Sequence, residues 1–210
     1  MGPRVAATRL SRERVLRAAF DQADDEGLDS VTMRSVAARL GVEAMSLYHH
    51  VPNKAAILDG LVDLLVQVAE LPTGELTAEG WIRGTAAGMR ALAQRHPRVV
   101  PLFNRRPVPL DDPRSARPFE AGLAAFAREG RDVGGGFAAV QAVLLSVLAL
   151  AQLEATAQSD PVPDNASALA GLSEVDFPML TAVARLDPGL EEFWRTLTEA
   201  LVEGLTRHTT

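Results

Sequence analysis

The sequence predicts an all-α protein, with a three-helix N-terminal domain that contains a helix-turn-helix and a larger helical C-terminal domain. Apolar residues recur at intervals of three and four along most of the chain, and no segment shows the alternation of a half-buried strand. Glycine and proline separate these periodic segments where helices are expected to begin and end. The 210 residues, 47% of them hydrophobic, are enough for one large or two small domains.

The first helix is expected from Ser11 to Glu26. Leu16, Phe20 and Ala23 fall on one face of this helix, which predicts that this face is buried. Gly27 ends it, because glycine adopts at low cost the backbone conformations that close a helix.

Residues 31–54 read VTMRSVAARLGVEAMSLYHHVPNK and predict two short helices joined by a turn. Thr32 is a favourable N-cap for the first of them, and Gly41 suits the left-handed residue that ends it. The second helix is expected from Ala44 to His50, because Pro52 disfavours the helical conformation at the residue before it. This pattern is typical of a helix-turn-helix, the unit that lays its second helix in the DNA major groove.

Leu47 is the one clear inward anchor of the second helix, which leaves its other residues facing outward or along the rim. No acid follows Glu43, and the outward groups can contact phosphates, base edges and thymine methyls. Asn53 caps the next helix, so Lys54 and the first amides there suit a phosphate. The candidate DNA-contacting residues are Thr32, Arg34, Ala44, Met45, Ser46, Tyr48, His49, His50 and Lys54. A plain pair of packed helices is the alternative that the pattern alone leaves open.

The same periodicity predicts further helices beyond this unit. They are expected at residues 54–71, 78–96, 119–129, 137–157 and 190–207, with a short one within 176–186. Residues 97–104 suggest a short helix or an irregular turn, and Arg105–Pro118 must include a loop. Gly134–Gly136 is expected to form a turn between two helices.

Residues 137–157 are the most apolar part of the chain and approach the length of a membrane span. Gln141, Ser146, Gln152 and Glu154 interrupt the segment, and no lysine or arginine flanks it closely. We therefore expect no membrane partner. Residues 137–157 are expected to form a helix that is buried in a core or an interface.

The sequence contains no residue pattern that is typical of an enzyme active site. The chain has no cysteine, which excludes disulfides, thiolate metal sites and cysteine nucleophiles. Its four histidines lack the HxxxH and HExxH spacings of metal sites, and no nucleophile elbow is found. We therefore expect no catalytic residue, no metal and no cofactor. The N-terminus has no apolar run, and a cytoplasmic protein is expected.

The net charge of −6 is unevenly distributed. Residues 1–54 carry a net charge of +1, and the remainder carries −7. Arginines precede a group of acids at the end of the first helix. Residues 1–10 are therefore expected to form a flexible basic arm, which either follows DNA phosphates or only adds solubility.

Residues from about Arg12 to Leu65 resemble the DNA-binding domain of the tetracycline-repressor (TetR) family. The resemblance is carried by RERVLRAAFDQADDEGLDS, TMRSVAARLGVEAMSLYHHV and NKAAILDGLV. It implies a homodimer that reads an inverted-repeat operator in double-stranded DNA and binds a small effector in its C-terminal domain. Residues 137–157 and 190–207 resemble the helices that form an intersubunit four-helix bundle in this family.

Residues 100–121 resemble the sensor domain of the subgroup closest to the tetracycline repressors. The candidate effector-binding residues combine apolar bulk with occasional polar atoms, and ordinary core packing is their alternative. They are Trp81, Thr85, Met89, Leu92, Phe103, Phe119, Phe126, Gln141 and Leu145.

Two departures from the tetracycline repressors change what the resemblance implies. In place of the polar residues that hold a magnesium–drug chelate, this chain has Glu70, Gly88, Leu92 and Leu102, so a mostly apolar effector is expected instead. Ala44 and Met45 replace a polar residue and a proline in the recognition helix, so a different operator is expected.

The leading hypothesis is a ligand-responsive homodimeric transcriptional repressor. Binding of its effector is expected to release the repressor from DNA. The alternative is a module that retains the fold but binds a ligand or a protein, with weak or no DNA binding. The expected divisions are the arm at 1–10, the helix-turn-helix domain at 11–54, a linking helix at 55–71, and the ligand-binding and dimerisation domain at 72–210.

Overall fold

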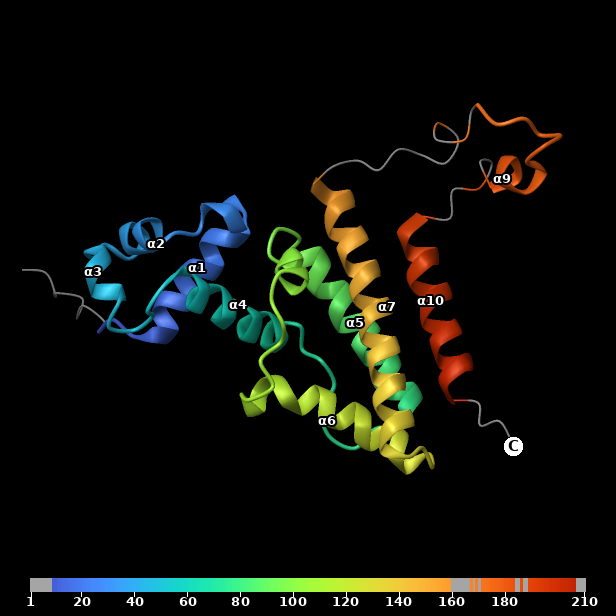
Figure 1. Cartoon of the computed structure of the whole chain (residues 1–210), viewed down its shortest axis with the longest axis horizontal. Helices are drawn as coiled ribbons and strands as arrows, with labels where there is room; N and C mark the ends of the chain where they lie inside the picture. Colours follow the sequence, from blue (N-terminus) through green and yellow to red (C-terminus); the bar gives the residue numbers. More distant parts are fainter. Residues whose placement is uncertain are drawn as a thin grey trace, which may run out of the picture. The chain divides into compact units, whose positions relative to one another are not determined.

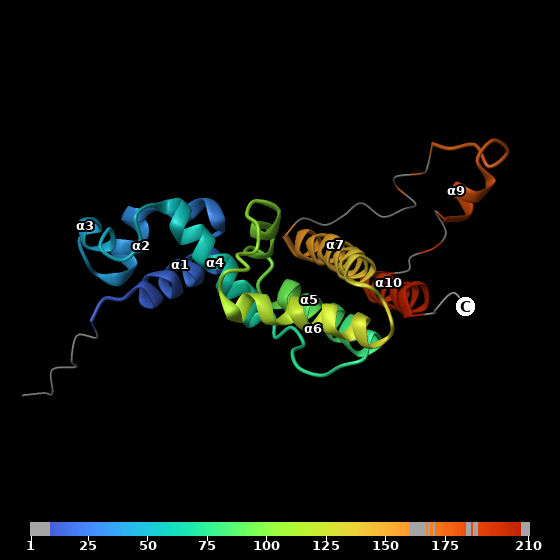
Figure 2. The ribbon, with the colours of Figure 1, turned by 60° about the horizontal axis from the view of Figure 1, so that its bottom comes forward.

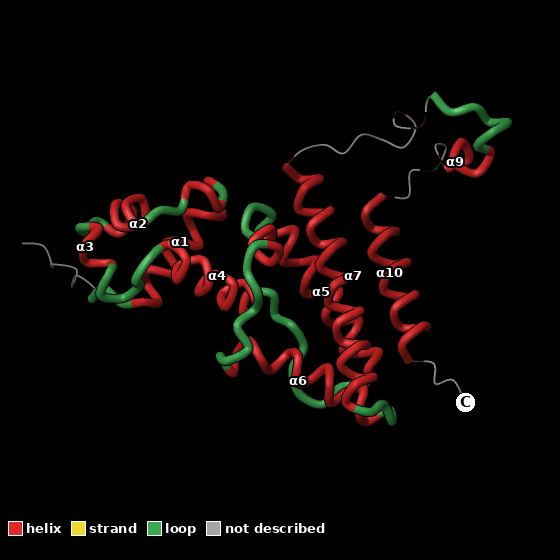
Figure 3. The backbone as a smooth tube through the Cα atoms, in the orientation of Figure 1, coloured by secondary structure: helices red, strands yellow, loops and turns green. Residues whose placement is uncertain are grey.

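The computed structural model describes residues 9–159, 171–183 and 189–206, together with 167, 169 and 186. Within this part of the chain every regular element is a helix, which confirms the predicted all-α class (Figures 1 and 3). Most of the expected basic arm and much of the segment after residue 159 lie outside the described residues.

The chain forms two compact units. Unit 1 contains the described residues of Met1–Val68 and Arg98–Ser115, and unit 2 contains those of Ala69–Pro97 and Ala116–Thr210. This division differs from the expected boundaries in two respects. The linking helix belongs with unit 1, and a later segment of the chain returns to that unit.

Unit 1 is built from α1 (Arg12–Glu26), η1 (Leu28–Ser30), α2 (Met33–Leu40), α3 (Ala44–Leu47), α4 (Lys54–Val68) and η2 (Val100–Asn104). Its core contains residues from α1 and α4 that approach closely. A Cβ atom added at Gly60 would lie 2.6 Å from both terminal methyl carbons of Leu16, so the two helices touch at this point. Other fully buried residues of unit 1 include Val15, Ala19, Val36, Leu47, Ile57 and Leu61.

Three arginines attach the returning segment to the rest of unit 1. The Arg98 guanidinium donates to the carbonyl oxygens of Asp24 and Asp25, at the C-terminal end of α1. Arg105 pairs with Asp29 at 3.2 Å, and Arg106 pairs with Asp59 of α4 at 3.3 Å. Of these arginines, Arg105 pairs with an acid of the cluster that follows α1, whereas Arg98 bonds to backbone carbonyls at the end of α1.

Unit 2 is built around α5 (Ala78–Arg95), α7 (Val133–Ser159) and α10 (Gly189–Thr206), which lie side by side in Figures 1 and 2. Helix α6 (Pro113–Arg128) contributes its residues from Ala116 onward, and α9 (Pro178–Val183) is a single short helix. Its fully buried residues include Trp81, Ile82, Leu92, Phe126 and Val143.

Two predictions on the boundaries of α6 and α7 were wrong. The helix expected from Phe119 starts earlier, because α6 already begins at Pro113, where proline is well tolerated at a helix start; the loop expected within 105–118 is confirmed at residues 105–112. The glycine triplet lies inside the first turns of α7. The turn before α7 falls at Gly130, which has a φ of +87°, and the Asp132 side chain accepts from the Gly135 N–H at 2.7 Å and caps the new helix.

Helix α7 has one buried face and one exposed face that is also apolar. Val140, Val143 and Val147 are buried within unit 2, whereas Phe137 is 56% and Leu145 is 67% exposed. By length and composition, Val133–Gln158 is the one described segment that could cross a membrane, and 33% of its most apolar window is buried. An exposed apolar face of this kind is typical of an interaction surface.

Candidate nucleic-acid interface

Local backbone chemistry fixes the two ends of α2. The Thr32 Oγ1 accepts from the Ser35 N–H at 3.0 Å, and the Ser35 Oγ accepts from the Thr32 N–H at 2.9 Å, which forms a capping box. At the other end Gly41 adopts the left-handed conformation with a φ of 67°, and its N–H is bonded to α2 carbonyls. Both predicted helix ends are confirmed.

Helix α3 is held by two apolar anchors. Leu47 is fully buried and Val51 is 1% exposed, and the N–H groups of His50 and Val51 both donate to the Leu47 carbonyl at 2.8 Å. The regular helix is shorter than predicted and ends at Leu47, with residues 48–50 continuing as a turn. The Asn53 side chain accepts from the Ala56 N–H at 2.9 Å and caps α4 as predicted.

All nine predicted DNA-contacting residues lie in unit 1, on α2, on α3 with its following turn, and at the first residue of α4. Met45 is 73% and Tyr48 is 48% exposed, although both are large side chains with apolar surface. The remaining residues are exposed or half-buried: Thr32, Arg34, Ala44, Ser46, His49, His50 and Lys54. The segment therefore presents a side-chain surface without an acid between Ala44 and Lys54.

Arg39, near the end of α2, forms ion pairs within unit 1 and is not one of the predicted DNA-contacting residues. Its guanidinium pairs with Asp25 at 2.5 Å and lies 3.8 Å from Glu26, so it fastens α2 to α1. The hydrogen bond to Asp25 raises the pKa of Arg39 above its usual value. This pairing joins α1 to α2, the helix that packs against α3.

The structure places the nine predicted effector-binding residues in different surroundings. Trp81, Thr85, Met89 and Leu92 are buried along α5, and the Trp81 ring meets the edge of Phe126 at 6.3 Å between centroids. Phe119 is half-buried on α6. By contrast, Gln141 and Leu145 lie on the exposed face of α7, and Phe103 belongs to unit 1.

Two buried polar side-chain atoms of α5 lie in the interior of unit 2, the Trp81 Nε1 and the Thr85 Oγ1. The Trp81 Nε1–H donates to the Pro118 carbonyl at 2.9 Å. The Thr85 Oγ1 is buried and has no hydrogen-bond partner among the described residues. Buried polar atoms are nearly always bonded, so this hydroxyl is a candidate contact for a bound molecule.

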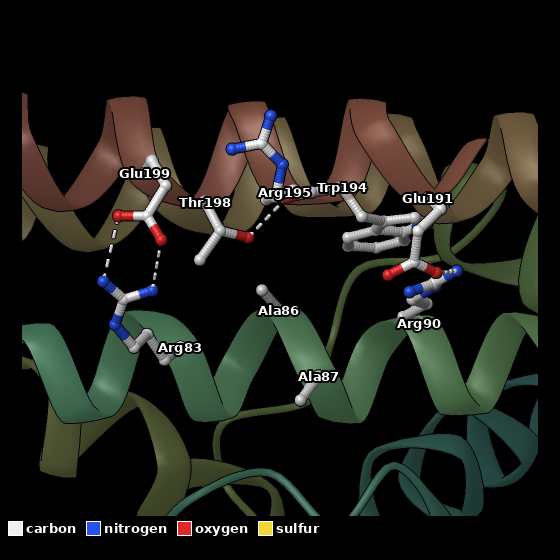
Figure 4. A pocket seen from close by; sticks show the side chains of 9 residues that line it. All are labelled: Arg83, Ala86, Ala87, Arg90, Glu191, Trp194, Arg195, Thr198 and Glu199. Atoms are coloured by element: carbon white, nitrogen blue, oxygen red, sulfur yellow. Dashed lines mark hydrogen bonds and ion pairs between the residues drawn. The ribbon is translucent and has the colours of Figure 1, made fainter. Parts of the chain in front are cut away.

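A groove between α5 and α10 was not predicted from the sequence. It encloses about 300 Å³, and Figure 4 shows Arg83 paired with Glu199 at one end and Arg90 beside Glu191 at the other. Ala86 and Ala87 line the groove between these pairs, and Figure 4 shows the Ala86 side chain directed toward α10. The sequence did carry a signal for this groove. Arg83 and Arg90 are seven residues apart on α5, and Glu191 and Glu199 are eight residues apart on α10, so opposite charges recur at a similar spacing.

Comparisons with known proteins agree with this geometry. Residues 15–61 match the family model described as bacterial regulatory proteins, tetR family. The chain is 40% identical over 102 residues to the HTH-type transcriptional repressor DrrR1 of Streptomyces coeruleorubidus, a match that covers 47% of this chain and 37% of that protein. It is 36% identical over 91 residues to the tetracycline repressor protein class D of Escherichia coli, covering 42% of each.

The fold extends beyond the region of sequence similarity. The Streptomyces coelicolor TetR family protein ActR, solved in complex with actinorhodin, superposes with a TM-score of 0.80 at 22% identity, covering 94% of this chain and 97% of that one. The match to the first curated relatives spans less than half of their length.

The structure defines an all-helical protein with a helix-turn-helix in its first unit. Residues 15–61 belong to the tetR family of bacterial regulatory proteins, and the chain as a whole has the fold of TetR family proteins.

Proposed function

We propose that the chain is a homodimeric transcriptional repressor that binds an inverted-repeat operator and is released by a small, mostly apolar effector. The observation that carries this proposal is the α3 surface, where Leu47 is buried while Met45, Tyr48 and His49 face solvent. A buried anchor with polar and thioether groups on the outside suits contacts to phosphates and base edges. The relatives named repressors support the direction of the response.

A second copy of the chain is the proposed partner of α7. Phe137, Leu145 and Leu153 on α7 and Phe193 on α10 are all exposed, on helices that lie side by side. A two-fold dimer through these helices would cover them and would present two α3 helices to a palindrome. Glu154 and Gln141 within α7 make a lipid partner unfavourable, so a cytoplasmic protein is proposed.

The effector is proposed to enter the interior of unit 2 beside α5. The buried side chains there are Trp81, Met89, Leu92 and Phe126, with the Thr85 hydroxyl as the polar contact. A Cβ atom at Gly88 would lie 2.5 Å from the Ala69 carbonyl oxygen, so this position holds no side chain that could bind a metal–drug chelate. ActR binds actinorhodin within a similar fold, which supports a small-molecule ligand here.

The first experiment is selection of bound duplexes from a random DNA pool with the full chain, followed by sequencing. Recovery of an inverted repeat is expected. Absence of enrichment at low salt would contradict DNA reading and favour a module with another partner. A salt titration on the recovered site then checks the contact type, because phosphate contacts impose a linear fall of log affinity with log salt concentration.

A further inference from the structure

Glu154 is the one charged residue of α7, and it is buried. The 27 residues of this helix are otherwise apolar, small or neutral polar, and Glu154 is only 6% exposed. A carboxylate in such a place requires partners, because an unpaired buried charge is strongly unfavourable.

The partners of Glu154 come from two other helices. Its Oε1 accepts from the Gln94 Nε2 of α5 at 2.8 Å, and its Oε2 accepts from the Trp194 Nε1 of α10. The Arg90 Nε of α5 lies 3.5 Å from the same Oε2, and the Arg90 guanidinium also pairs with Glu191 of α10 at 2.6 Å. The carboxylate therefore joins α5, α7 and α10 at one point.

The contacts between α5 and α10 leave a groove along part of their length. Between the Arg90 and Arg83 ends, Ala86 and Ala87 supply no large side chain, and a space of about 300 Å³ remains (Figure 4). The Arg83–Glu199 pair is exposed by 41% and 47%, so solvent and salt screen it. The Trp194–Glu154 bond, by contrast, is buried.

A buried ionic group is weak evidence for stability, since well-packed apolar replacements are often as stable. Its best-attested effect is to select one arrangement among several. A slide of α10 by one turn, about 5.4 Å, would move the indole N–H away from the carboxylate. Apolar side chains alone would tolerate such a slide far better.

We infer that Glu154 is a positioning residue, which fixes α10 along α5 and α7 and thereby shapes the surface that a second copy of this chain meets. This inference rests on the proposed homodimer. The exposed apolar side chains of that surface lie on the two helices that the Glu154–Trp194 bond joins, among them Leu145 on α7 and Phe193 on α10.

The test uses the full chain, which has no cysteine of its own, so spin labels attach only where they are introduced. Arg95→Cys and Thr196→Cys place one label on α5 and one on α10, at exposed positions. Labelled chain is mixed with excess unlabelled chain, and the distance between the two labels is measured by pulsed electron resonance. Glu154→Met and Trp194→Phe are compared with the parent, together with thermal melting and sedimentation of the unlabelled variants.

The parent is expected to give one narrow distance. Glu154→Met is expected to broaden or shift it while the melting midpoint stays close to that of the parent, and to weaken self-association at least ~10-fold. An unchanged distance in both variants would overturn the inference. A loosened α10 with unchanged self-association would overturn its link to the second copy.

Trp194→Phe removes the N–H that donates to Glu154 and keeps an aromatic ring. If Glu154→Met does not fold, this variant tests whether the bond positions α10. A monomeric parent would refute the proposed homodimer and, with it, the link to the second copy. The distance within one subunit would still show whether Glu154 positions α10, which keeps the two failures distinguishable.

Discussion

Gly122 of α6 lies directly against the indole of Trp81 on α5. A Cβ atom at position 122 would stand 2.6 Å from two ring carbons of Trp81, which is 1% exposed. The ring cannot move freely, because its Nε1–H is bonded to the Pro118 carbonyl at 2.9 Å. The missing side chain therefore sets how closely α6 approaches α5.

Gly122→Ala is expected to lower the free energy of unfolding by about 1–3 kcal/mol, the usual cost of forcing extra atoms into a packed core. Chemical denaturation of the two proteins measures the difference. Gly134→Ala is the matched control, since a Cβ there would meet no atom closer than 3.8 Å. Helix propensity favours alanine at both positions, so Gly134→Ala should not destabilise the chain. Equal destabilisation by both changes would contradict the role given to the Trp81 contact.

Met45 and Tyr48 are expected to affect DNA binding in different ways. Tyr48→Ala should weaken binding to every duplex by a similar factor, because a phenol at the end of α3 suits phosphate contacts. Met45→Ala should alter the preferred bases, because the thioether side chain is 73% exposed on α3. Repeating the random-pool selection with each variant measures both effects, and an unchanged affinity of Tyr48→Ala would sink the assignment of that residue.

Leu47→Ala provides the structural counterpart of these two changes. The side chain is fully buried, so its truncation is expected to cost about 2–5 kcal/mol of stability. DNA affinity should fall with it, because α3 would lose its anchor. A variant with the stability of the parent would show that other contacts hold α3, and Met45→Ala serves as the control with an exposed side chain.

Most of unit 1 could be predicted because its signals are local. Thr32 and Ser35 cap α2 within one turn, and Gly41 ends the helix at the expected place. The start of α7 could not be placed, because the Asp132 cap competes with the glycine triplet and only the folded backbone shows which decides the boundary. The bond between Glu154 and Trp194 joins residues 40 apart and depends on how three helices pack, which the periodicity of one helix does not contain.

Two aspartates of unit 1 have pKa values that are shifted in opposite directions, so they make the stability of the unit depend on pH in opposite ways. Hydrogen bonds from Arg114 lower the pKa of Asp112 to about 2, whereas burial raises the pKa of Asp63 despite a hydrogen bond from Ser115. For Asp112 the folded pKa is below the unfolded one, so its contribution to stability is present above about pH 3.9 and is lost as the pH falls toward 2. For Asp63 the sign is reversed, and its contribution declines as the pH rises through its raised folded pKa.

Arg114→Ala is therefore expected to raise the pKa of Asp112 toward its unperturbed value of about 3.9, measured by carboxyl NMR titration. Asp63→Asn should remove the opposite dependence, so that stability declines less as the pH rises above the usual aspartate pKa of about 3.9. Arg117→Ala, at an exposed position of α6, is the control and should leave the Asp112 titration unchanged. A pKa of Asp112 that stays near 2 without Arg114 would contradict this explanation.

Leu145→Arg tests the covering of α7. The leucine is 67% exposed on the outer face, so the change should leave the fold of one chain nearly intact and disrupt association with a second copy. Sedimentation velocity should then show monomers at concentrations where the parent is dimeric. Leu110→Arg is the control, since Leu110 is 56% exposed in unit 1 and carries no part of the proposed dimer surface. If Leu145→Arg remained dimeric, another face of the chain would have to form the interface, and the pairing proposed for α7 would be wrong.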